Sequence, residues 1–153
     1  MSNNFLKCMD TIPQGVFIVA TKKEETFNFM TAAFVTQISF HPCSIAVSVD
    51  RSHYTAELIT KQGEFSLSVL AEGQELEAKY CGYQSGRMVD KAERMKYFVT
   101  QSGLPVIDGA AAYMICKVAK IVEYEDHMVF ISEILEGDVT EKASLIYQSS
   151  VYF

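Results

Sequence analysis

The pattern of hydrophobic and polar residues is most unusual over residues 26–49, a segment that contains no Asp, Glu, Lys or Arg. Its length would allow a membrane span, but polar side chains such as Asn28, Gln37 and His41 interrupt it repeatedly. Spanning segments rarely carry so many polar groups, because lipid offers them no hydrogen-bond partners. We therefore expect the segment to be buried in protein, with its polar groups bonded to neighbouring residues or to a flat, neutral ligand.

Alternation of large and small residues predicts a strand over 44–49. The large side chains of Ile45, Val47 and Val49 share one face, while Ser44, Ala46 and Ser48 share the other. The large face fits a core, and the small face leaves room for either a packed element or a ligand. Runs rich in β-forming residues predict further strands at 16–21, 27–33, 64–70, 111–124, 127–135 and 144–153.

Helical spacing is confined to short segments. Apolar spacing predicts a helix over 54–62, with Ser52 as its N-cap and Gly63 as its C-terminal stop. A second helix is predicted over 74–81 and is expected to end at Gly82. The remaining expectations are a helical lead-in within 1–12, charged turns at 22–25 and 125–126, loops at 35–42, 82–91 and 103–109, and a helical or irregular segment at 92–100.

The order of these elements predicts the fold class. Hairpins and short helical excursions join the strands, without regular alternation of parallel strands and helices. This order is typical of a mostly β protein, an antiparallel split β-barrel with helices outside it. The chain of 153 residues is 49% apolar and 21% charged, which fits one soluble globular domain over 1–153.

Charge and cysteine usage narrow the function classes. A net charge of −6 gives no support for a basic surface that binds nucleic acid or anionic membrane. The first residues contain no apolar run of signal-peptide length, so we expect a cytoplasmic location. Neither the cysteines nor the histidines show metal-ligand spacing. We expect four reduced structural thiols, at Cys8, Cys43, Cys81 and Cys116. Among them we expect Cys81 to be the more exposed, because it lies beside Gly82.

Candidate chemistry follows directly after the uncharged segment. Arg51, Ser52 and Thr55 bring a cation and two hydroxyls to a predicted helix start, as a phosphate site requires, although Arg51 alone would also fit a solvated loop. A neutral pocket beside an anion site describes a flavin mononucleotide (FMN) pocket. The sequence lacks the glycine-rich dinucleotide motif, the P-loop, the zincin motif and the hydrolase nucleophile motif, so those enzyme classes are unsupported.

Two blocks, Ser85-Gly-Arg-Met-Val-Asp-Lys91 and Asp126-His-Met-Val-Phe-Ile-Ser-Glu133, are specific in combination. Further matching blocks lie at 15–21, 28–33, 37–42, 44–49, 65–70 and 103–106. Together they resemble the flavin reductase-like domain, the FMN-binding split barrel of flavoredoxins, over nearly the whole chain. The resemblance is strongest to the flavin domain that precedes rubredoxin in high-molecular-weight rubredoxins of anaerobes.

The resemblance implies FMN at a homodimer interface and hydride transfer from NADH or NADPH. By similarity, the isoalloxazine ring is lined by Asn28, Thr31, Ala33 and Phe34, with Gln37 and Ser39 at its edge. The ribityl chain and phosphate are assigned to Ser48, Arg51, Ser52 and Thr55, with Lys91 reaching the phosphate or the ring. His127 and Phe130 are placed on the nicotinamide side, with His127 as the catalytic candidate. Tyr83 and Arg87 fit either a cofactor loop or a subunit interface, and His41 and His53 fit structural or surface roles.

Three function classes remain open at this point. The first is an NAD(P)H-dependent FMN reductase, or an FMN electron carrier that passes electrons to a separate rubredoxin-like or other acceptor protein. The second is a flavin-storage module without turnover. The third is the sister split barrel that binds haem or a pyridoxal-type phosphate. A visible spectrum separates flavin from the third class, and anaerobic mixing with NADH or NADPH separates a reductase from a storage module.

Overall fold

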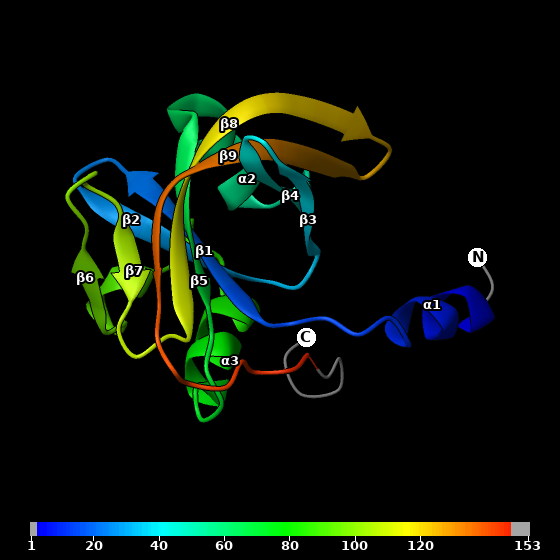
Figure 1. Cartoon of the computed structure of the whole chain (residues 1–153), viewed down its shortest axis with the longest axis horizontal. Helices are drawn as coiled ribbons and strands as arrows, with labels where there is room; N and C mark the ends of the chain where they lie inside the picture. The colour runs from blue at the N-terminus through cyan, green and yellow to red at the C-terminus, as the bar shows by residue number, and fades with distance from the viewer. Residues whose placement is uncertain (1–2, 148–153) are drawn as a thin grey trace.

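The computed structural model describes residues 3–147 and is built around one curved antiparallel sheet (Figure 1). Seven strands lie in the spatial order β2-β1-β5-β8-β9-β4-β3. Their bounds are β1 Phe17–Lys23, β2 Thr26–Ala32, β3 Val35–Phe40, β4 Cys43–Asp50, β5 Glu64–Val69, β8 Ala112–Tyr124 and β9 His127–Val139. The short strands β6 (Tyr97–Val99) and β7 (Pro105–Ile107) form a separate pair. The predicted mostly β class with an antiparallel sheet is confirmed.

Helices surround this sheet. They are α1 (Asn3–Asp10), α2 (Tyr54–Gln62), α3 (Glu75–Tyr83) and the 3₁₀ turn η1 (Lys91–Glu93). Figure 1 shows α3 beside the lower end of the sheet and α1 projecting away from the rest of the molecule. No helix among residues 3–147 is long and apolar enough to cross a membrane.

The apolar run that predicts β1 is continuous because both faces of this strand are covered. Ile18 packs in a cluster with Phe29 and α3, whereas Val19 packs in a second cluster with Phe65 and α2. Successive side chains of a strand point to opposite faces, so a strand between two packed layers needs apolar residues at every position. The two clusters therefore fix α2 and α3 on opposite faces of the sheet, where they position the site.

The predicted charged turns are confirmed. Lys23 pairs with Thr26 across the first turn, and Tyr124 pairs with His127 across the second. Glu24 and Glu125 have φ angles of 53° and 50°. Positive φ in a two-residue turn matches the twist of the flanking strands, which explains the tight hairpins.

The loop predicted at 35–42 is wrong, because the structure contains β3 there. This strand lies at the edge of the sheet and pairs with β4 alone. Residues 36–40 are all exposed, so neither of its faces needs a hydrophobic pattern. Without a buried face, the period of two that marks a strand is lost from the sequence.

Helix boundaries differ from the sequence predictions in two places. The N-cap of α2 is His53 rather than Ser52, and its C-cap Gly63 adopts φ 73°, as the predicted stop requires. The helix predicted to end at Gly82 continues through that residue to Tyr83, because a glycine near a helix end costs only about 1 kcal/mol.

The C-terminal part of the chain differs in two further ways. Strand β9 runs to Val139, beyond the predicted end at residue 135. Of the strand predicted over 144–153, Ser144 and Ile146 form isolated bridges with Ala71 and Gly15, and residues 148–153 lie outside the described part.

All four thiols are free, but only two are buried. Cys81 and Cys116 are in the core, where burial raises the pKa of each thiol to about 12. Cys8 and Cys43 are exposed, so the structural role predicted for all four is wrong for this pair. The prediction that Cys81 is the more exposed thiol is also wrong, because α3 continues past it and packs it against the sheet.

Candidate functional site

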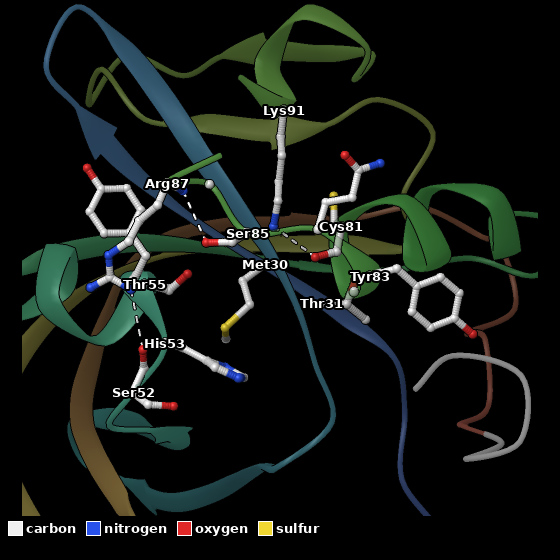
Figure 2. A pocket seen from close by; sticks show the side chains of 14 residues that line it. Met30, Thr31, Ser52, His53, Thr55, Cys81, Tyr83, Ser85, Arg87 and Lys91 are labelled. Carbon is white, nitrogen blue, oxygen red and sulfur yellow. Dashed lines mark hydrogen bonds between the residues drawn. The ribbon is translucent and has the colours of Figure 1, made fainter. Parts of the chain in front are cut away.

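Two adjoining cavities open between the start of α2 and the ends of strands β2, β4 and β9. The loop cavity, of about 480 Å³, is lined by residues 52–55, 81–87 and Lys91. The strand cavity, of about 210 Å³, is lined by residues 30–34, 48–50 and His127. Both cavities include Met30, Thr31 and His53 in their walls. They therefore adjoin each other and are together called the cleft; its loop-cavity end is drawn in Figure 2.

The N-terminus of α2 opens into the loop cavity. Residues 52–55 all line it, and His53 caps the helix without a side-chain hydrogen bond. The first turn of a helix presents backbone N–H groups and a partial positive charge. This end of the cavity is therefore prepared to bind an anion.

Arg87 adds a cation at the same place (Figure 2). Its Nη2 atom lies 2.5 Å from Oε2 of Glu57, and its Nη1 donates to the carbonyl of Ser52 at 3.4 Å. Its guanidinium carbon lies 4.8 Å from the centre of the Tyr54 ring. These contacts hold the guanidinium beside the start of α2, at the wall of the loop cavity.

Lys91 adds a second cation, which is buried. Its side chain lines the loop cavity, and its ammonium donates to the carbonyls of Phe29 and Cys81 at 2.8 and 2.9 Å. Burial lowers the pKa of Lys91, and no carboxylate pairs with it among residues 3–147. An ammonium has three donors, and two carbonyls carry no net charge. An anion in the loop cavity would supply the counter-charge for this ammonium.

Asn28 joins β2, α2 and the 84–90 loop behind the wall of this cavity. The side chain is buried, and its Nδ2 donates to Oγ1 of Thr55 at 2.9 Å. Its Oδ1 is buried without a hydrogen-bond partner among the described residues. Gly86 packs directly against this atom, since a Cβ at Gly86 would lie 1.7 Å from it. Asn28 thus supports the loop that carries Arg87 through its contact with Gly86.

The strand cavity is less charged. Thr31, Ala33 and Ser48 present small side chains to it, and Phe34 lies beside His127 with ring centres 5.7 Å apart. Nδ1 of His127 lies 2.8 Å from Oδ1 of Asp126, which orients the imidazole at the end of β9. A cavity with small side chains and an aromatic wall fits a flat ring system.

Asp50 lines the strand cavity. Both the hydroxyl and the backbone N–H of Ser52 donate to its Oδ1, at 2.7 and 2.9 Å. These bonds, with smaller contributions from the charges of His53 and His127, lower the pKa of Asp50. The Ser52 hydroxyl is therefore engaged with Asp50 rather than directed at the cavity.

Several predicted ligand contacts lie elsewhere in the structure. Gln37 and Ser39 are exposed on the edge strand β3, and Arg51 is exposed and lines neither cavity. Phe130 is fully buried, because it points from β9 into the core cluster beneath α2. The assignment of Phe130 to the nicotinamide side is thereby corrected. Thr31, Ala33, Phe34, Ser48, Ser52, Thr55, Lys91 and His127 all line the cleft.

Two residues that line the cleft are not among the site residues that the sequence predicts. His53 lines both cavities, although it was assigned a structural or surface role. Arg87 lines the loop cavity, which favours the cofactor-loop alternative for it. Two sequence features could have identified them: Arg87 lies in the Ser85–Lys91 block, and His53 lies at a predicted helix start.

Comparisons with known proteins agree with this geometry. The model of the flavin reductase like domain matches residues 9–153. High molecular weight rubredoxin of Moorella thermoacetica is 34% identical over 142 residues, covering 92% of this chain and 60% of that protein. The NADH-dependent flavin reductase StyB of Pseudomonas fluorescens is 30% identical over 134 residues, covering 87% of this chain and 76% of that protein.

A solved structure shows the same fold. The FMN-binding protein from Thermus thermophilus superposes with a TM-score of 0.80 at 28% identity, covering 85% of this chain and 74% of that protein. This chain spans less than two thirds of the rubredoxin relative, so the match concerns one part of that protein. The predicted split-barrel fold and the predicted flavin reductase resemblance are confirmed. The chain belongs to the flavin reductase-like domain family.

Proposed function

We propose that this protein is an FMN-dependent oxidoreductase that takes electrons from NADH or NADPH. It acts either as a flavin reductase or as an electron carrier that serves a separate acceptor protein of the rubredoxin type. The single observation that carries the proposal is the cleft, in which a weakly charged strand cavity adjoins a loop cavity suited to an anion.

The loop cavity suits the phosphate of FMN. The start of α2 offers backbone N–H groups, and Arg87 and Lys91 offer charged donors, in a protein whose net charge is −6. Ser85 and Thr55 add hydroxyl groups to the same wall. This grouping of donors is specific to the cavity and does not reflect a generally basic surface.

The strand cavity suits the isoalloxazine ring. Ala33 and Ser48 leave space near the backbone, and Phe34 supplies an aromatic wall. FMN, when bound, supplies the redox chemistry, and the protein supplies binding and orientation. His127, held by Asp126 at 2.8 Å, lies where it can position a nicotinamide at the open side of this cavity.

The proposal is tested by comparing the affinities of FMN and riboflavin, which differ by the phosphate. A charge-assisted hydrogen bond contributes roughly 1.5–3 kcal/mol, so Arg87→Ala should weaken FMN about ten- to a hundredfold. Arg51→Ala removes an exposed arginine outside both cavities and should change FMN affinity less than about twofold. Fluorescence titration gives both values. Equal affinities of the wild type for FMN and riboflavin would overturn the phosphate assignment.

We further propose that the protein works as a homodimer. Large apolar side chains are exposed on α1 (Phe5, 64%) and on β3 (Phe40, 80%). In the view of Figure 1, both elements lie on the same side of the molecule as the turn between β8 and β9. A symmetry partner can cover exposed apolar side chains of this kind.

Light scattering tests the dimer. Phe40→Glu should shift the protein toward the monomer mass, whereas Leu76→Glu, a control at an exposed apolar residue on α3, should not. A wild type with monomer mass when loaded with FMN would contradict the proposal.

We also expect one domain over residues 1–153 and a cytoplasmic location. Limited proteolysis would check the first expectation, and cell fractionation would check the second.

A further inference from the structure

The guanidinium of Arg87 is occupied by a carboxylate of the protein itself. Nη2 lies 2.5 Å from Oε2 of Glu57, while Nη1 donates to the carbonyl of Ser52 at 3.4 Å. Glu57 lies in the first turn of α2, two residues after Thr55, which lines the loop cavity. The cation that lines the cavity is therefore paired with a carboxylate that does not line it.

A carboxylate and a phosphate make the same kind of bond to arginine. Both accept charge-assisted hydrogen bonds from the planar guanidinium, often two at a time. Of the five N–H groups of its guanidinium, Arg87 gives one to Glu57 and one to Ser52, both at the start of α2. A phosphate that bonds to these same two N–H groups would make Arg87 exchange one anionic partner for another.

We propose that Glu57 competes with the phosphate of the ligand for Arg87, and thereby sets how readily the flavin exchanges. This inference rests on the proposed function. The competition is mild, because the side chains of Arg87 and Glu57 are 48% and 63% exposed and water screens their attraction. Glu57 consequently tunes affinity without preventing binding. When the flavin leaves, Arg87 returns to Glu57.

The test is Glu57→Gln, which keeps the shape of the side chain and removes its charge. Exposed ion pairs contribute little, so we expect FMN to bind about two- to fivefold more tightly, with a similarly slower dissociation. Riboflavin, which lacks the phosphate, should bind as it does to the wild type. Glu72→Gln is the matched control, because it removes the same charge from an exposed residue, whereas the carboxylate paired with Arg87 is that of Glu57.

A double variant separates competition for Arg87 from general repulsion of the phosphate. If Glu57 acts through Arg87, then Glu57→Gln should have no effect on FMN affinity in the Arg87→Ala background. The inference is overturned if Glu57→Gln leaves FMN affinity unchanged, tightens riboflavin equally, or has the same effect with and without Arg87. Equal binding of FMN and riboflavin to the wild type would instead remove the proposed function, and the inference with it.

Discussion

Gly86 offers the most direct structural test of the loop that carries Arg87. A Cβ at this position would lie 1.7 Å from Oδ1 of Asn28 and 3.3 Å from Cδ2 of Tyr54. The backbone of Gly86 is not in the left-handed region, so alanine is disfavoured there by space and not by φ. Gly86→Ala must therefore move either the loop or Asn28.

Neither movement is free. Asn28 is 1% exposed, and swinging it away would break its 2.9 Å bond to Thr55 inside the protein. Leaving a buried polar group unpaired costs about 1–3 kcal/mol, and overpacking costs about the same. We expect Gly86→Ala to lower the free energy of unfolding by about 1–3 kcal/mol. Each kcal/mol lost should lower Tm by roughly 2–4 °C. Because a lifted loop carries Arg87 away from α2, FMN affinity should fall about tenfold.

Chemical denaturation and FMN titration measure the two effects. The second substitution Asn28→Ala removes the atom that Cβ would meet, so Asn28→Ala/Gly86→Ala should be more stable than the sum of the single changes predicts. A coupling of at least about 1 kcal/mol is expected for groups in such contact. If Gly86→Ala matches the wild type in both stability and FMN affinity, the loop is not seated on Asn28 as described.

Three further predictions concern individual side chains of the cleft. His127→Ala should slow reduction of bound FMN by NAD(P)H in stopped-flow experiments and leave FMN affinity within about threefold; loss of FMN instead would place His127 in the flavin site. Lys91→Met should weaken FMN roughly tenfold by titration, while riboflavin binding remains unchanged if the ammonium serves the phosphate. Ser52→Ala removes the hydrogen bond that contributes most to the lowered pKa of Asp50. The resulting stability difference from the wild type should be present at neutral pH and shrink as the pH falls through the folded pKa; a pH-independent difference would contradict this.

The sequence predicted most of the buried framework, because burial forces a periodic pattern. The alternation of residues 44–49 gave β4 correctly, and Ile45, Val47 and Val49 all lie in the core. Strand β3 escaped because exposure removes the constraint that produces alternation. The same logic limits the boundaries of β9, whose last residues are exposed and carry no required pattern.

Site residues were predicted less well, because their roles depend on the direction of each side chain. Arg51 is close to the start of α2 in sequence, and Arg87 is close to it in space, but only Arg87 lines the loop cavity. Phe130 lies three residues after His127, and the alternation of β9 turns the two side chains to opposite faces. A lone histidine carries no sequence signal, although the place of His53 at the start of α2 makes it line both cavities.

One measurement bears most directly on the central claim that the cleft holds a flavin accessible to a reduced nicotinamide. FMN-loaded protein is mixed anaerobically with NADH or NADPH, and the visible band of the oxidised flavin is followed in a stopped-flow spectrometer. We predict that the band bleaches in a single turnover with at least one of the two donors, and more slowly in His127→Ala. A wild-type protein that binds no FMN, or whose bound FMN stays oxidised with both donors, would contradict the proposed function.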